Sequence, residues 1–405
     1  MKKIVNLALG IVTSIGGFVE VGSISTSVQA GTEFGFSLLW AVAAATLFLA
    51  ALAEMAGRIA AVSRQSMAAA VRERFGFQFQ IIPLGAEFII DTLLLTAELG
   101  GVAIAVKMLT GIGFQWWILP VGLVAWLLLW VGSFSVIEDG VGLLGMVTLS
   151  FVIAAWRLHP DTGQIARGFL PSVPHHDVTR YAFLTVSIVG ATVSPYLLNF
   201  YSSGAIEEKW TEQDVWINRL TAWLGMGFGG TVAMGCLITA AIVLGPQHVK
   251  VETYEQAAQM FVPVYGRWAV TLFALSLGIG CFGAAVEIAL NAGYAFGQAL
   301  GWTWGIDKKR RDVSRFVAAF SFVLLLAMAI AITGLDPLRV TLISVALTVV
   351  VMPLVVLPFL VLMNDEQYAG QHTSGPFGNG LLATLTILGA LMAIVVIPLE
   401  ILGGS

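Results

Sequence analysis

Long apolar windows follow one another along the chain, each close to the length of a membrane-spanning helix. Such a helix takes about 20 predominantly apolar residues, and windows of this length recur between short polar segments. The longest intervening segments, near 158–178 and 246–266, suit loops or short surface helices. We therefore predict one transmembrane domain over residues 1–405, with about eleven spanning helices at 4–29, 36–62, 81–108, 114–134, 140–157, 179–204, 216–245, 267–299, 313–333, 337–363 and 379–403.

Two of these windows carry polar and helix-breaking residues near their middle. In the first window, Glu20 and Gly22 lie in a segment, 16–27, that also holds four hydroxyl side chains. In the sixth window, Pro195 follows Ser194. A proline inside a helix removes one backbone donor and clashes with the preceding turn. We therefore expect both helices to be interrupted within the membrane.

The interrupted windows are the first and the sixth, so the breaks recur after five spans. An odd number of spans per repeat inverts the second copy, and matching breaks in two inverted halves indicate a substrate site near the midplane. We predict an all-α integral membrane protein with repeats near 4–157 and 179–363, followed by an extra helix near 379–403. The alternative is a pair of ordinary kinks whose hydroxyl groups bond to their own helices.

The composition excludes several other classes of protein. Hydrophobic residues make up 58% of the chain and charged residues 11%, whereas soluble domains carry roughly 25% charged residues. The formal charge is −4, and the basic run 308–311 suits a cytoplasmic loop, so we expect no nucleic-acid partner. No ATP-binding loop, catalytic triad or zinc signature is present, so we expect neither an enzyme nor a bound cofactor. Cys236 and Cys281 lie in apolar stretches and suit small buried residues.

The distribution of Lys and Arg predicts the orientation. With the N-terminus in the cytoplasm, 13 of the 20 basic residues fall on the cytoplasmic side and 7 on the outside, as the positive-inside rule requires. We therefore predict a multi-pass protein of the cell (inner) membrane with a cytoplasmic N-terminus and an external C-terminus. We expect a monomer or weak homo-oligomer in contact with membrane lipids.

Residues at the two breaks are the candidate binding site. A charge at the bilayer centre costs roughly 2.5–3.5 kcal/mol, so Glu20 should face a cavity or a partner. Ser23 and Ser194 are candidate ligands, and so is the Ala191 carbonyl that the break would free. We list Tyr196 and Asn199 as candidates for lining the same cavity.

Further carboxylates fall within the predicted spans. Glu54, Asp91 and Glu287 would pair with hydroxyl groups or line an aqueous cavity, and Glu98 is a candidate cavity residue. Glu87 lies nearer a predicted helix end and is expected at the membrane interface. The five histidines all fall in predicted loops, so no histidine is expected to relay protons inside the membrane. They are His159, His175, His176, His248 and His372.

Several segments resemble the Nramp family of proton-coupled divalent metal transporters. The matching segments are 29–40, 72–75, 97–98, 190–193 and 271–275, and they extend over most of the chain. The resemblance implies the leucine-transporter-like fold, with eleven helices in a 5+5 inverted repeat and breaks in helices 1 and 6. It also implies a divalent metal ion as transported substrate.

The chemistry of the two breaks departs from the family pattern. The helix-1 motif Asp-Pro-Gly-Asn stands here as segment 20–23, with Glu20 as the carboxylate and Ser23 in place of the amide. The helix-6 motif Met-Pro-His stands as segment 194–196, with Ser194 and Tyr196 in place of thioether and imidazole. Other family polar positions are apolar here, namely Leu95, Val345 and Val351. In these respects the chain is similar to the Nramp-related branch associated with magnesium.

The ligand types favour a hard cation. Thioether and thiolate ligands select softer metals, whereas carboxylate, carbonyl and water suit magnesium, calcium and manganese. Magnesium is usually held through one or two carboxylates with several waters retained. We therefore expect transport of Mg²⁺ or Mn²⁺ without proton coupling. Transport of another small solute, an organic cation or an anion, and a sensor that has lost transport are the alternatives.

Overall fold

The computed structural model describes residues 20–172, 174, 177–247 and 251–403, and no β-strand occurs among them. Nine helical segments of these residues are long and apolar enough to cross a membrane. The shorter apolar helix α6 (Gln115–Val131) corresponds to the predicted span 114–134. The spans are built from α3 (Leu39–Ser63), α5 (Phe77–Thr110), α7 (Phe134–Gly145) with α8 (Leu149–Arg157), α10 (Val178–Thr192) with α11 (Pro195–Glu207), α12 (Val215–Val243), α15 (Ala269–Leu300), α16 (Ser314–Ile332), α17 (Pro337–Leu362) and α19 (Pro376–Gly403).

Short helices connect the spans. They are α4 (Met67–Phe75), α9 (Thr162–Gly168), α13 (Tyr254–Ala257), α14 (Val262–Tyr265) and α18 (Glu366–Ala369). The predicted span 140–157 starts earlier than expected, at Phe134, because the Ser133 side chain accepts a hydrogen bond from the Val136 N–H and caps the helix. A capping hydroxyl of this kind satisfies a donor that the first helical turn leaves free.

The predicted breaks in the first and sixth spans can be compared with the helix bounds in the structure. Of the first span, residues 4–19 lie outside the described residues, and α2 (Val21–Phe34) begins directly after the extended residue Glu20. The sixth span is divided into α10 and α11 by Val193 and Ser194, which are not helical. The break before Pro195 thus lies where the sequence predicted it.

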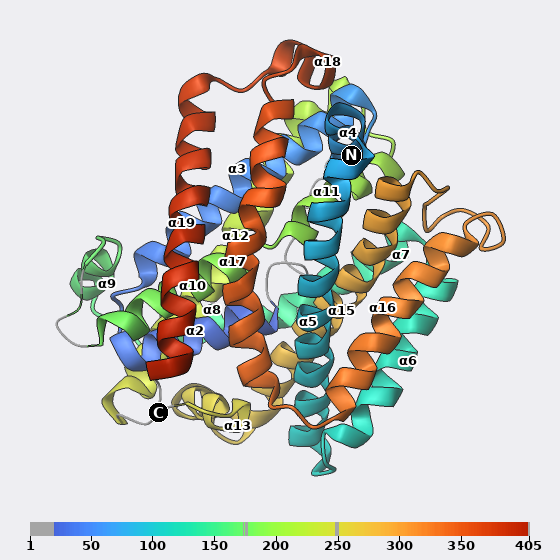
Figure 1. The fold of residues 1–405 in the computed structure, drawn as a ribbon. Coiled ribbons are helices and arrows are strands. Elements are labelled where there is room, and N and C mark those ends of the chain that lie inside the picture. Colours follow the sequence, from blue (N-terminus) through green and yellow to red (C-terminus); the bar gives the residue numbers. More distant parts are fainter. Residues whose placement is uncertain (1–19, 173, 175–176, 248–250, 404–405) are drawn as a thin grey trace.

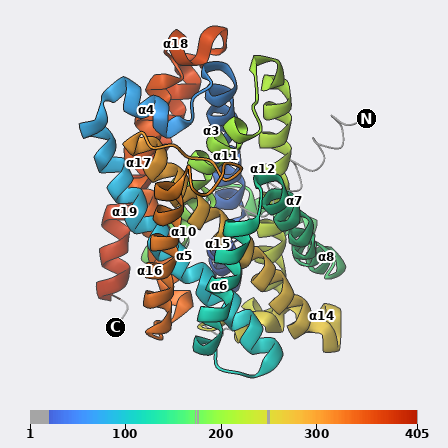
Figure 2. The same cartoon turned by 90° about the vertical axis from the view of Figure 1, so that its right-hand side faces the viewer.

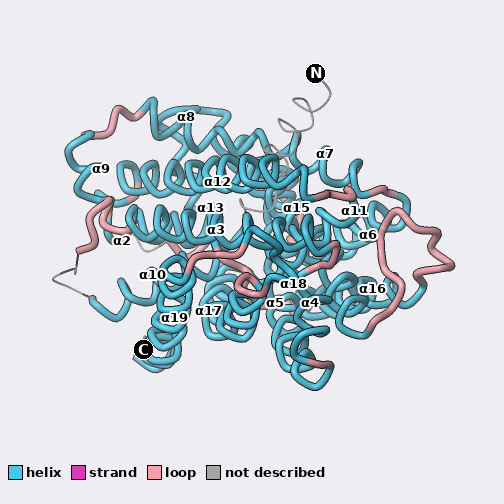
Figure 3. The backbone as a smooth tube through the Cα atoms, turned by 90° about the horizontal axis from the view of Figure 1, so that it is seen from above, coloured by secondary structure: helices cyan, strands magenta, loops and turns pink. Residues whose placement is uncertain are grey.

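The broken segments lie among the long helices (Figure 1). Helix α2 packs on α10 and α12, α10 packs on α17, and α5 packs along α15. Seen from above, α3 and α12 run side by side, as do α17 and α19 (Figure 3). Helices α6 and α16 pack together at the right-hand side of Figure 1, the side that faces the viewer in Figure 2.

Glycines allow the backbones at the centre to approach closely. A Cβ atom at Gly31 of α2 would collide with the Leu237 carbonyl of α12, and one at Gly190 of α10 would collide with the Val345 carbonyl of α17. Small residues at helix–helix contacts are the usual means of close packing in membranes, where hydrophobic burial between helices gives little driving force. These two contacts hold α2 and α10 in position beside the bundle.

One charged cluster ties three of these helices together. Arg180 of α10 donates to both carboxylate oxygens of Glu33, at 2.7 and 2.8 Å, and to Glu400 of α19 at 2.8 Å. Its guanidinium also donates to Gln29 of α2 at 2.7 Å. A planar guanidinium suits this forked arrangement better than an ammonium does.

Connections rich in basic residues gather at one end of the molecule. Figure 1 places α4 and α18 at that end, and α13 at the opposite end. Arg72 and Arg74 belong to α4, and the connection from α15 to α16 carries the basic run 308–311. Assignment of this end to the cytoplasm remains a prediction from the positive-inside rule. Lys2, Lys3 and Lys250, which entered that prediction, lie outside the described residues.

Candidate cation site at the helix breaks

Glu20 lies at the start of α2 and is fully buried. Its Oε2 atom accepts a hydrogen bond from the Tyr196 hydroxyl of α11 at 2.9 Å, whereas its Oε1 atom is buried without a hydrogen-bond partner. Burying a carboxylate is costly unless its oxygens are paired or coordinate a cation. Among the predicted site residues, the unpartnered Oε1 atom of Glu20 is therefore the strongest evidence for a ligand-binding site.

Glu98 of α5 holds the beginning of α2. The Val21 N–H donates to both carboxylate oxygens of Glu98, each at 3.2 Å. The first N–H groups of a helix have no partner within the helix, and a negative charge at that end interacts favourably with the helix dipole. Glu98 thus positions the element that carries Glu20.

The break of the sixth span leaves a backbone carbonyl without its helical donor. Pro195 has no N–H, so the Ala191 carbonyl, four residues earlier, lacks its usual helical donor. A Cβ atom built on Gly22 would lie 3.1 Å from Glu20 Oε1, 3.2 Å from Ala191 Cβ and 2.8 Å from Val345 Cγ1. The start of α2, the end of α10 and the middle of α17 therefore meet at the unpartnered oxygen.

The two predicted serine ligands bond locally. Ser23 Oγ accepts from the Glu20 N–H at 3.1 Å and donates to the Glu20 carbonyl at 3.0 Å. Ser194 Oγ donates to the Gly190 carbonyl at 3.1 Å. Both hydroxyls lie at the breaks, and both bond to backbone groups of their own segments. Their role as ligands stays a prediction.

The charge around the breaks is negative. Glu20, Glu98 and Glu287 are all buried, and the charge of Glu20 acts on both Glu98 and Glu287. None of the ion pairs formed by the described residues involves these three carboxylates. No three or more His, Cys, Asp or Glu side chains of the described residues are close enough to share one metal ion. Among the described residues, at most two such side chains can therefore bind one ion, and carbonyl oxygens or water must complete its coordination.

Asn199 does not join the site around Glu20. Its Nδ2 donates to Glu87 Oε1 at 2.5 Å, and Asn291 of α15 donates to the same oxygen at 3.0 Å and to Asp91 at 2.9 Å. The expectation that Glu87 lies at the interface is wrong, because Glu87 is only 3% exposed and its carboxylate pairs with two buried amides. Helix α5 begins at Phe77 rather than near 81, so Glu87 lies almost three turns inside it.

The sequence reasoning missed Asn291. It is an amide within the long apolar window 267–299, and nothing local to that window distinguishes a ligand from a packed side chain. The expectation for Glu54 also needs correction, because its carboxylate pairs with Arg58 at 2.7 Å and not with a hydroxyl or a water-filled cavity. An i, i+4 pair on one helix face brings these opposite charges together.

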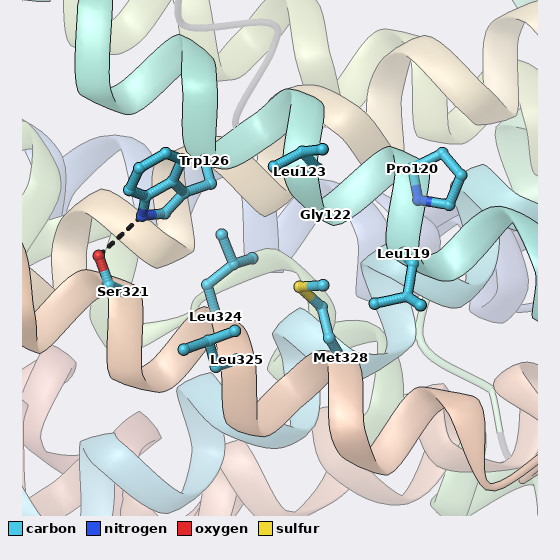
Figure 4. A pocket seen from close by; sticks show the side chains of 9 residues that line it. All are labelled: Leu119, Pro120, Gly122, Leu123, Trp126, Ser321, Leu324, Leu325 and Met328. Carbon is cyan, nitrogen blue, oxygen red and sulfur yellow. Dashed lines mark hydrogen bonds between the residues drawn. The ribbon is translucent and has the colours of Figure 1, made fainter.

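The structure also has a large cavity at its edge, unrelated to the breaks. It measures about 690 Å³ and lies between α6 and α16 (Figure 4). Its walls are almost entirely apolar, and its polar side chains, Ser321 and Trp126, bond to each other at 2.9 Å. Such a cavity suits a lipid chain rather than an ion, because it offers no unpaired oxygen ligands.

Comparison with known proteins identifies the family. The model of the Nramp (natural resistance-associated macrophage protein-like) family matches residues 10–398, which is nearly the whole chain. The chain belongs to the Nramp family. A divalent metal cation transporter, MntH, from Deinococcus radiodurans is 27% identical to this Nramp protein over 289 residues. That match covers 67% of the chain and 64% of the relative, so the chain spans slightly less than two thirds of the relative's length.

Solved structures confirm the predicted fold of this Nramp protein. A manganese transporter from Eremococcus coleocola, in complex with an aromatic bis-isothiourea substituted compound, has a TM-score of 0.81 and 19% sequence identity. The likeness covers 96% of this chain and 85% of that chain. A nucleobase-cation-symport-1 family transporter in a closed conformation has a TM-score of 0.63 and 13% identity, over 96% of this chain and 91% of that chain. The leucine-transporter-like class of fold is thus confirmed, and the relatives are named as transporters rather than enzymes.

Substitution of Gly22 by Ala tests whether an ion occupies the space beside Glu20 Oε1. The added methyl group would crowd that oxygen and displace Val345. We expect Gly22→Ala to weaken Mn²⁺ binding about tenfold, equivalent to about 1.4 kcal/mol, in calorimetry on purified protein. The matched control is Gly227→Ala on α12, where a new Cβ meets nothing within 4 Å. Unchanged affinity in a folded Gly22→Ala protein would place the ion elsewhere.

Proposed function

We propose that this Nramp protein carries a divalent cation across the membrane, with a preference for Mg²⁺ over softer metals and without coupling to protons. The observation that carries the proposal is the buried, unpartnered Oε1 atom of Glu20, which adjoins Gly22 where the end of α10 approaches at Ala191. Support for the class of substrate comes from the relatives, one named a divalent metal cation transporter and one a manganese transporter. The transported ion acts as substrate and not as a resident cofactor.

The charge around the breaks favours a cation over an anion. Three buried carboxylates surround the start of α2, and none of them forms an ion pair with a described basic residue. The N-terminus of a broken helix can attract an anion, but here Glu98 already accepts the Val21 N–H. An anionic solute would meet both an occupied helix terminus and like charge.

The donor atoms favour a hard cation. Glu20 and the Ala191 carbonyl supply oxygen, and the residue at the break of the sixth span is Ser194 rather than a thioether. Oxygen ligands suit magnesium, calcium and manganese, whereas sulfur ligands shift preference towards softer metals. A site with one carboxylate leaves coordination positions for water, which magnesium retains readily.

Neutralising Glu20 tests the site. Glu20→Gln keeps the shape of the side chain and an acceptor for the Tyr196 hydroxyl, but removes the charge that would balance the ion. We expect uptake of Mg²⁺ and Mn²⁺ into proteoliposomes to fall to the level of empty liposomes, with the protein still monodisperse. Glu252→Gln, at an exposed acid outside the spans, is the charge-matched control and should transport as the wild type. Wild-type uptake by Glu20→Gln would show that Glu20 is not a ligand of the transported ion.

Introducing a thioether at the break tests the selectivity. We expect Ser194→Met to raise the affinity for Cd²⁺ or Mn²⁺ relative to Mg²⁺ about tenfold, because it adds a soft ligand. Competition calorimetry measures this ratio. Ser321→Met is the control, because it adds the same group beside the apolar cavity between α6 and α16. An unchanged ratio in Ser194→Met would remove Ser194 from the site.

Metal entry without proton entry is the expected form of transport. Leu95 and Tyr196 replace polar family positions, and the described histidines, His159 and His372, lie outside the spanning helices. One charge crossing 100 mV gains about 2.3 kcal/mol, so a divalent ion gains about twice that. At about 1.4 kcal/mol per factor of ten, this drive accumulates the ion about a thousandfold.

A pH-sensitive dye inside proteoliposomes measures proton coupling directly. Under a potassium–valinomycin potential, we expect metal to enter without acidification of the lumen. Glu98 is the buried carboxylate best placed to carry a proton, because it lies beside both Val21 and the Glu20 charge. Metal-dependent acidification that is lost in Glu98→Gln would contradict uncoupled transport.

A further inference from the structure

Four polar side chains from three helices meet inside the protein, away from Glu20. Glu87 and Asp91 come from α5, Asn199 from α11 and Asn291 from α15. All four are at most 3% exposed. We propose that these four residues, named here the amide–carboxylate cluster, form a second binding site for a hard divalent cation.

No basic side chain among the described residues pairs with the carboxylates of the cluster. Glu87 and Asp91 lie close enough to repel each other. Their hydrogen-bond partners are the neutral amides of Asn199 and Asn291, and neither carboxylate forms an ion pair with a described basic residue. Two buried negative charges require positive charge from outside the protein or from bound protons. One divalent cation neutralises both carboxylates at once.

Three buried oxygens of the cluster lack hydrogen-bond partners. They are Oδ1 of Asp91, Oδ1 of Asn199 and Oδ1 of Asn291. Buried polar atoms are almost always satisfied, so three orphaned oxygens in one cluster indicate a missing ligand. A half-turn of each amide exchanges its NH₂ group and its oxygen. Both amide oxygens would then point where their nitrogens now meet the carboxylates.

The donor atoms select the type of cation. Turned in this way, the cluster offers carboxylate and amide oxygens and no sulfur or imidazole. Carboxylate and amide carbonyl oxygens are the ligands of calcium, magnesium and manganese. A softer metal such as cadmium would gain no preferred ligand here.

The cluster lies about one helical turn from the residues at the breaks. On α11, Asn199 follows Tyr196 by three residues, and on α15, Asn291 follows Glu287 by four, so each pair shares a helix face. Further along the same two helices, Gln298 donates to Ser203 at 2.7 Å. Polar side chains therefore continue from Glu20 towards the end of α11 near Glu207. A role as a station on the ion's route rests on the proposed function, whereas binding at the cluster does not.

Counting bound Mn²⁺ by equilibrium dialysis separates the two sites. Glu87→Gln with Asp91→Asn keeps the volume of the cluster and one acceptor oxygen on each side chain but removes its charge. We expect two Mn²⁺ ions per wild-type protein, one in Glu20→Gln, one in the double variant and none in the triple variant. Glu252→Gln is the control and should bind as the wild type. Excess Mg²⁺ should displace Mn²⁺ from the cluster.

The outcomes distinguish the second site from the first. Loss of all Mn²⁺ in Glu20→Gln, or wild-type stoichiometry in the folded double variant, would overturn the second site and leave transport through Glu20 untouched. Conversely, one Mn²⁺ retained in Glu20→Gln and lost in the triple variant supports the cluster even if Glu20 proves irrelevant to transport. Anomalous diffraction from wild-type crystals soaked in Mn²⁺ needs no variant to fold. A peak among the four side chains is expected, and its absence at saturating Mn²⁺ would overturn the proposal.

Discussion

The rest of the structure depends on buried carboxylates at the start of α2. One of them, Glu98, accepts a hydrogen bond from the first residue of the helix, and another, Glu20, directly precedes the helix. Glu98 accepts the Val21 N–H and so allows α2 to start in the middle of the molecule. Without such a partner, an N–H group at a buried helix start would be unsatisfied, because lipid and packed side chains offer no replacement. The same contact fixes the position of Glu20, the residue immediately before α2. The hydrogen bonds from Val21 to Glu98 therefore both stabilise the start of α2 and hold the candidate ligand Glu20 in place.

Close backbone packing brings the ends of α2 and α10 together beside Glu20 and so forms the candidate cation site. Gly190 places the end of α10 directly on the α17 backbone, and Gly22 brings the start of α2 to within contact of both. Pro195 leaves the Ala191 carbonyl without its helical donor, and the Ala191 side chain approaches Gly22, which also adjoins the unpartnered Glu20 Oε1. A larger residue at either glycine would separate the broken ends, because packed helices of a membrane bundle have little room to adjust. The site thus depends on small residues as much as on charged ones.

The carboxylates within and around the bundle have two different kinds of partner. Arg180, Glu33 and Glu400 form ion pairs that tie α2, α10 and α19 together, and Glu54 pairs with Arg58. By contrast, Glu20, Glu87 and Asp91 have neutral partners or none, and oxygens near them remain unsatisfied. Ion pairing satisfies a structural charge permanently. A carboxylate without a basic partner stays available to a cation that binds and is released. This difference distinguishes the proposed cation sites from the ion pairs that hold the helices together.

The sequence by itself determined the class of fold, most of the spans and the position of the break before Pro195, because window length, hydropathy and proline geometry are local properties of the chain. It also singled out Glu20, since a lone carboxylate in an apolar window is conspicuous. The pairing of Glu98 with Val21, the burial of Glu87 and the meeting of Asn199 with Asn291 were decided only by the tertiary structure. These residues lie far apart in the chain. The local sequence around an amide or carboxylate in an apolar helix is the same whether the side chain faces lipid, a neighbouring helix or an ion. Which of these it faces depends on how the helices rotate and pack, and that is set by contacts between segments.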